Sequence, residues 1–148
     1  MGMRYSSQFN LDKLRQNLFA RQGRFNKDMR DATEAGAELI MAKSQSNSPV
    51  DTYNLEEAHH IEKSITAADH VRFTVEVSGV GYGSERPRDV ANYAMEVHEN
   101  YTNMGPKSAA KLAAGHEVGG KFLERAVETE KQKAIALIRA AVRKNWNR

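Results

Sequence analysis

Residues 93–126 read YAMEVHENYTNMGPKSAAKLAAGHEVGGKFLERA, and the fold is best predicted by working outward from them. A half-buried strand ends at His98-Glu99, a loop with Gly105-Pro106 follows, and a helix begins after Gly119-Gly120. None of these residues has the spacing of a metal site, of a nucleophile with its base, or of a phosphate-binding loop. So many turn residues and so few catalytic groups indicate a protein that acts through its surfaces, as part of an assembly.

The size and composition allow one domain, residues 1–148, with one core. Apolar residues make up 40% of the chain and charged residues 28%, which is typical of helices exposed on one side or of a protomer that its neighbours complete. The net charge of +3 is too small to indicate nucleic-acid binding by itself. The chain has no cysteine, so disulfides and thiolate metal sites are excluded. No apolar run is long enough to predict a signal peptide or a membrane span.

Two helices are predicted within residues 1–47. A glycine in a helix interior costs about 1 kcal/mol, so Gly23 predicts a bend or break between them. The second helix carries an apolar stripe from Phe25 to Ile40 and ends before Pro49, whose ring disfavours helical geometry in the preceding residue.

Residues 49–99 are predicted to be rich in β-structure. Ala58–Ala67 and the stretch from Val71 to Val77 alternate apolar and polar residues, and the short connection between them predicts an antiparallel hairpin. A loop is predicted over residues 79–88. A third strand is predicted from Val90 to His98, although its alanines and methionine would also suit a helix.

The rest of the chain is predicted to be a long loop, residues 100–120, followed by a final helix over residues 121–146. The loop includes a short helical piece at Ser108–Ala114. The fold class is therefore α+β: a small antiparallel β-sheet flanked by N-terminal helices and a long C-terminal helix.

Two other patterns suggest ligand sites but lack the necessary spacing. His59 and His60 are adjacent on a predicted strand, so their side chains point to opposite faces and cannot chelate one ion. Gly79–Gly83 is rich in glycine, but no helix follows it, as a dinucleotide-binding loop would require. We therefore expect no metal and no cofactor.

The end of the last helix is basic, with Arg139, Arg143, Lys144 and Arg148. Positive charge near the negative end of the helix dipole is enough to explain them. Contact with DNA or with an acidic partner is the alternative explanation.

Four segments, in this order, resemble motifs of the neck and tail-completion proteins of tailed bacteriophages. The segment at Pro49–Ala58 resembles "PVDTGNLxxS", and Tyr93–Glu99 resembles "YAxxxHE". Gly105–Ser108 resembles "GPxS", and Val118–Ala126 resembles "VGxKFLxRA". The motif residues singled out are Pro49, Val50, Asp51, Thr52, Leu55, Tyr93, Ala94, His98, Glu99, Gly105, Pro106, Gly119, Phe122 and Leu123. Two positions depart from the motifs: Tyr53 replaces glycine, and Glu56 replaces an arginine, which argues against a phosphate or acidic contact there.

The resemblance implies a virion protein of the head–tail junction, present in the host cytoplasm before assembly. Such proteins form a ring, here expected to be six- or twelvefold, between the portal and the tail, and they are not enzymes. Expected partners are further copies of the chain, a portal-side adaptor, tail-tube or sheath proteins, and transient non-specific DNA in the lumen, with no membrane. The loops expected to contact neighbours contain Gly81, Tyr82, Gly83, Arg86, Asn103, Met104 and Lys107.

Two other hypotheses come from different classes. A small nucleic-acid-binding module would use the basic C-terminal helix, and its DNA affinity would fall steeply with salt. A hydrolase would use His98, Glu99 or Asp51, but no partner base or metal for them can be named from the sequence.

Overall fold

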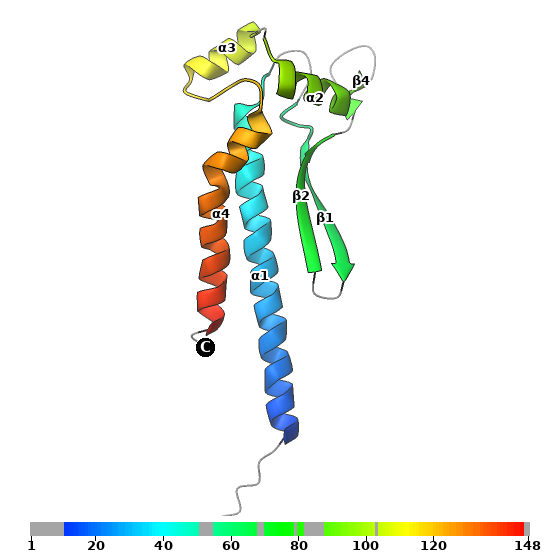
Figure 1. The fold of residues 1–148 in the computed structure, drawn as a ribbon, viewed down its shortest axis with the longest axis vertical. Coiled ribbons are helices and arrows are strands. Elements are labelled where there is room, and N and C mark those ends of the chain that lie inside the picture. The colour runs from blue at the N-terminus through cyan, green and yellow to red at the C-terminus, as the bar shows by residue number, and fades with distance from the viewer. Residues whose placement is uncertain are drawn as a thin grey trace, which may run out of the picture.

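A computed structural model describes residues 11–50, 55–67, 70–78, 80–81, 88–102 and 104–146. Its framework is a pair of long antiparallel helices, α1 (Leu11–Asn47) and α4 (Phe122–Trp146), with a β-hairpin on the other side of α1 (Figure 1). Two short helices, α2 (Val90–Asn100) and α3 (Pro106–Ala113), lie at the end where α1 finishes and α4 begins. The predicted α+β class is confirmed.

The hairpin pairs β1 (His59–Ala67) with β2 (His70–Val77) as predicted. Its register places Ile61 opposite Val75 and Ile65 opposite Val71, so these apolar residues share one face, with Lys63 opposite Phe73 between them. This face packs against α1, which therefore lies between α4 and the hairpin. A second small sheet pairs β3 (Val80–Gly81) with β4 (Arg88–Asp89).

The predicted break at Gly23 is wrong, because α1 continues through it for 37 residues. Gly23 has open space around it and no turn or proline beside it. Its cost of about 1 kcal/mol is local, and the surrounding leucines, arginines and glutamines favour a helix. The chain thus has one long N-terminal helix where two were predicted.

The predicted third strand is also wrong, because Val90–Asn100 forms α2. The buried residues are Val90, Ala94 and Val97, spaced four and three apart, which is the period of a helix and not of a strand. Alanine, methionine and glutamate in the segment also favour the helix. His98 and Glu99 consequently lie in the last turn of a helix.

The remaining helices lie close to their predicted positions. The helical piece within residues 100–120 is α3, which begins at Pro106, a residue well suited to a first helical turn. The final helix, α4, begins at Phe122, one residue after the predicted start, and ends at Trp146. Where α1 and α4 cross, a Cβ atom on Gly36 would lie 3.1 Å from the Cβ of Ala134, so the glycine permits their close approach.

Candidate functional site

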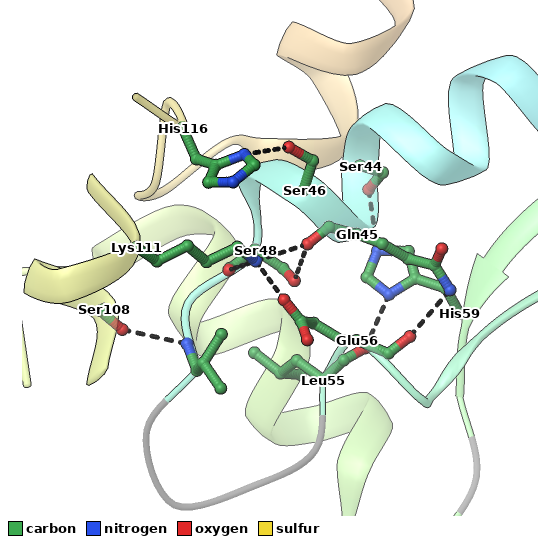
Figure 2. Close-up of polar contacts among 11 residues, drawn as sticks. Ser44, Gln45, Ser46, Ser48, Leu55, Glu56, His59, Ser108, Lys111 and His116 are labelled. Atoms are coloured by element: carbon green, nitrogen blue, oxygen red, sulfur yellow. Dashed lines mark hydrogen bonds and ion pairs between the residues drawn. The ribbon is translucent and has the colours of Figure 1, made fainter. Parts of the chain in front are cut away.

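The end of α1 is the meeting point of most of the polar side chains that are buried in the described part of the chain (Figure 2). Residues 44–48 of α1 and its exit contact the turn before β1, at residues 55–59, and helix α3. We call this region the α1 junction. Lys111 of α3 is 55 positions from Glu56 and 66 from Gln45 in the sequence, so the junction is a product of the tertiary structure.

Lys111 of α3 links all three segments of the α1 junction. Its side chain is 14% exposed, and its Nζ donates hydrogen bonds to the carbonyl oxygens of Gln45, at 2.8 Å, and Ser48, at 2.9 Å. It also donates to the carboxylate of Glu56. The last carbonyls of a helix have no partner within that helix, and a lysine complements their partial negative charge. Lys111 therefore caps α1 from a different helix, and all three of its N–H donors have acceptors.

Glu56 is the residue that replaces arginine in the resembling motif. Its carboxylate accepts the third hydrogen bond of Lys111, so the departure is explained by an internal ion pair. An arginine at this position would place two positive charges together.

His59 is buried in the α1 junction, with 6% of its surface exposed. Its Nδ1 lies 2.6 Å from the carbonyl oxygen of Leu55, and its Nε2 lies 2.8 Å from the Ser44 hydroxyl. A carbonyl can only accept, so Nδ1 carries the proton, and in the neutral ring the serine hydroxyl donates to Nε2. Burial lowers the pKa of His59 below its ordinary value of 6.5, although backbone hydrogen bonds oppose this shift. The neutral ring is therefore a structural element with both nitrogens in use.

Further hydrogen bonds attach α3 and the loop after it to the end of α1. The Ser108 hydroxyl accepts from the backbone N–H of Val50 at 3.0 Å, and Ser46 bonds the ring of His116 at 2.8 Å. Figure 2 shows these contacts on the α3 side of the junction and His59 on the β1 side. The two sides together fix where the chain leaves α1.

A small apolar core lies next to the junction and consists of Leu55, Val90, Ala94, Val97 and Phe122. Phe122, the first residue of α4, is 1% exposed and lies between two histidine rings. Its ring centroid is 5.7 Å from that of His59 and 5.2 Å from that of His98, the latter in an edge-to-face arrangement. The start of α4 is thus anchored on the turn before β1 and on α2.

The Gly119-Gly120 pair allows the chain to pass close to two other segments. The backbone N–H of Gly119 donates to the carbonyl of Asn47 at 3.1 Å, and that of Lys121 donates to the carbonyl of His98. A Cβ on Gly120 would lie 3.0 Å from the same His98 oxygen, which is a clash with backbone. Gly120 is therefore needed for close packing, and Gly119 has a positive φ of 150° that favours glycine.

One comparison with known proteins is decisive. A family model described as "Bacteriophage HK97-gp10, putative tail-component" matches residues 12–146. The chain belongs to this HK97-gp10-like family. No curated protein and no solved structure matches it. The predicted membership in the phage neck and tail-completion proteins is thereby confirmed, and the family description places the chain among the structural proteins of the virion.

The described parts of the four segments that resemble phage neck and tail-completion motifs come together around the α1 junction. Among the singled-out residues Pro49, Leu55, Ala94 and Phe122 are buried, and Val50, Tyr93, His98, Gly105, Gly119 and Leu123 are half-buried. Glu99 and Pro106 are exposed, and His98 and Glu99 bond to each other at 2.9 Å. Asp51 and Thr52 lie outside the described residues. The motifs thus describe one structural junction of the chain.

Three of the predicted loop contact residues fall in the described part of the chain. Met104 is exposed just before α3, Lys107 is exposed in the first turn of α3, and Gly81 lies in β3, while Tyr82, Gly83, Arg86 and Asn103 are outside the described residues. Arg139 and Arg143 are exposed near the opposite end of α4, where Lys144 pairs with Asp28 of α1 at 3.2 Å. Arg148 is outside the described residues.

Lys111, Ser44 and His59 are junction residues whose roles sequence reasoning missed. One sequence feature could have indicated the role of Lys111: it is the single charged residue in the alanine-rich run of residues 109–114. His59 was considered only as a metal ligand, and as expected its side chain and that of His60 differ, the first being buried and the second exposed.

Among the described residues, no three histidine, aspartate or glutamate side chains form a cluster that could hold a metal ion. None of the helices in the described part of the chain is long and apolar enough to span a membrane.

Proposed function

We propose that this HK97-gp10-like protein is a structural component of the phage head–tail junction that forms an oligomeric ring between the portal and the tail. It acts there as a connector, tail-completion or tail-terminator protein, and not as an enzyme. The observation that carries the proposal is the N-terminal part of α1, which extends beyond the end of α4 with its leucines exposed (Figure 1). Exposed apolar patches of this kind mark surfaces that bind other proteins.

The α1 junction supports a structural role over a catalytic one. Lys111 donates all of its three hydrogen bonds within the chain, and both ring nitrogens of His59 are engaged. Groups used in this way hold segments together and have no donor or lone pair left for a substrate. The proposed partners are further copies in a six- or twelvefold ring, a portal-side adaptor, tail-tube or sheath proteins, and DNA passing through the lumen.

Removal of the gene from the phage that encodes this chain tests the proposal. Without the protein, DNA-filled heads and separate tails should accumulate, as counted by electron microscopy, and supplying the gene in trans should restore joined particles. Native mass spectrometry of the protein released from purified particles should give a closed multimer. Joined, infectious particles that lack the protein would refute the proposed role.

The basic ends of α1 and α4 favour DNA binding as a second candidate function. Residues 11–30 and 134–146 together carry nine basic and two acidic side chains, a net charge of +7. DNA affinity that falls steeply with rising salt would support this function, and no binding at low salt would exclude it. Phosphate contacts, however, do not account for the leucines exposed on the same part of α1.

A further inference from the structure

The N-terminal part of α1 carries an apolar stripe formed by Leu11, Leu14, Leu18 and Phe25. Spacings of three, four and seven residues place these four side chains on one face of the helix. Leu11 is 69% exposed and Leu18 is 58% exposed. Figure 1 shows no other helix or strand of the described chain beside the first turns of α1. Farther along the helix the same face carries Met29, which is half-buried, so the stripe continues a surface that packs elsewhere.

A groove of about 390 Å³ lies between α4 and β2, with α1 as its floor. Its lining is mostly apolar and includes Ile40 of α1, Phe73 and Val75 of β2, and Val127 and Ile138 of α4. Val127 is 41% exposed and the other four are half-buried, so the groove is open to solvent and unfilled by the described chain. Its geometry resembles that of sites which bind an amphipathic helix along its apolar face.

The stripe and the groove have similar lengths. Leu11 and Phe25 are fourteen residues apart, about 21 Å at a rise of 1.5 Å per residue. The groove residues of α4 extend from Leu123 to Ile138, fifteen residues apart and about 22 Å long. The two surfaces of a single chain cannot meet, because the floor of the groove is the continuation of the same rigid helix.

The charges of the two surfaces are opposite. Residues 11–30, which carry the stripe, have six basic and two acidic side chains, a net charge of +4. Residues 31–138, which contain the floor, β2 and the groove-lining part of α4, have eleven basic and seventeen acidic side chains, a net charge of −6. Pairing two stripes symmetrically would bring like charges together, whereas placing a stripe on the body of another copy brings opposite charges together.

We propose that the stripe of one copy docks in the groove of the next copy, so that the contact is head-to-tail and uses two different surfaces. This inference rests on the ring proposed above and specifies the surfaces that build it. A head-to-tail contact closes into a ring when its repeated rotation adds up to a full turn, while a symmetric contact stops at a dimer. An exposed Trp146, 87% accessible at the end of α4, lies next to Phe25 and extends the same apolar surface.

Cross-linking through engineered cysteines tests the contact, because the chain has none of its own. Leu18→Cys and Val127→Cys replace exposed residues, one in the stripe and one in the groove. With a bismaleimide, the full-length chain that carries both changes should give a ladder of covalent multimers. Each single variant should stay monomeric on a denaturing gel, and a mixture of the two should stop at a dimer. Unchanged thermal unfolding of each variant is the control for folding.

Several results would overturn the proposal. Dimers of Leu18→Cys alone would indicate a symmetric contact. No ladder in solution where the wild-type chain is oligomeric, or none within purified particles, would exclude this contact while leaving the ring itself standing. A chain that is monomeric both in solution and in particles would remove the proposed function as well. Cross-linking that occurs only when DNA is added would assign the basic end to nucleic acid.

A matched pair of charge variants gives a second measurement. Leu18→Asp places a carboxylate in the stripe and should raise the dissociation constant of the oligomer at least tenfold. Ala20→Asp adds the same charge on the opposite face of the helix and should change it less than threefold. Equal effects of the two variants, measured by analytical ultracentrifugation, would show that the stripe is not the contact.

Discussion

At the scale of single residues, Lys111 is the side chain on which the α1 junction depends. Replacing it by methionine removes the donor from two carbonyls and a carboxylate. The Gln45 carbonyl still accepts from the backbone N–H and the hydroxyl of Ser48, so the main loss is the donor to the Ser48 carbonyl. A buried acceptor left without a partner costs about 1–3 kcal/mol, so Lys111→Met should lower the free energy of unfolding in urea by about that amount. Lys107→Met, on the exposed side of the same helix, is the control and should change it by less than about 0.5 kcal/mol. Equal losses would contradict the capping role.

His59 makes the stability of the protein depend on pH. Burial lowers the pKa of its ring in the folded chain below the value of 6.5 expected when unfolded, so the unfolded chain binds the proton more tightly. The free energy of unfolding should therefore fall as the pH drops below 6.5 and level off once the folded ring is also protonated. Urea titrations at pH 7.5 and 5.5 should show a smaller fall for His59→Gln than for the wild type. His60→Gln, at an exposed neighbouring position, should keep the wild-type fall.

At the scale of elements, the crossing of α1 and α4 depends on the small side chains at Gly36 and Ala134. Gly36→Leu would force atoms into a contact that is already 3.1 Å for a single added carbon, and overpacking of this kind costs about 1–3 kcal/mol. The same change at Gly23, where the space is open, should stabilise α1 by up to about 1 kcal/mol through helix propensity. Thermal and urea unfolding, carried out at the same protein concentration, measure the change in stability of each variant. A Gly36→Leu variant as stable as the wild type would show that the crossing is not tight.

At the scale of the whole molecule, the separation of charge between the first part of α1 and the body predicts how salt affects assembly. The Debye length is about 10 Å at 0.1 M salt and 3 Å at 1 M, so high salt screens attraction between the basic stripe and the acidic body. Oligomers observed by light scattering at 0.1 M salt should therefore dissociate partly at 1 M. A symmetric pairing of basic stripes would respond in the opposite direction, because screening would relieve its repulsion.

The sequence determined those features that depend on neighbours along the chain. Alternation of apolar residues predicted the β1–β2 hairpin, and helical spacing together with Gly119-Gly120 predicted where α4 begins. The motif segments were sufficient to predict the family, because their residue types and their order can be read directly from the sequence. Local patterns work here because each reports the burial of one face of one element.

Only the tertiary structure decided the remaining features. A short segment such as Val90–Asn100 fits both a strand and a helix until the position of its core is known, and the core made by Leu55 and Phe122 selects the helix. The capping of α1 by Lys111 joins residues more than sixty positions apart, and no local pattern encodes such a pairing. The groove exists because α1 holds α4 and β2 on either side of it, whereas the stripe that we expect to fill it was already visible as leucines at helical spacing.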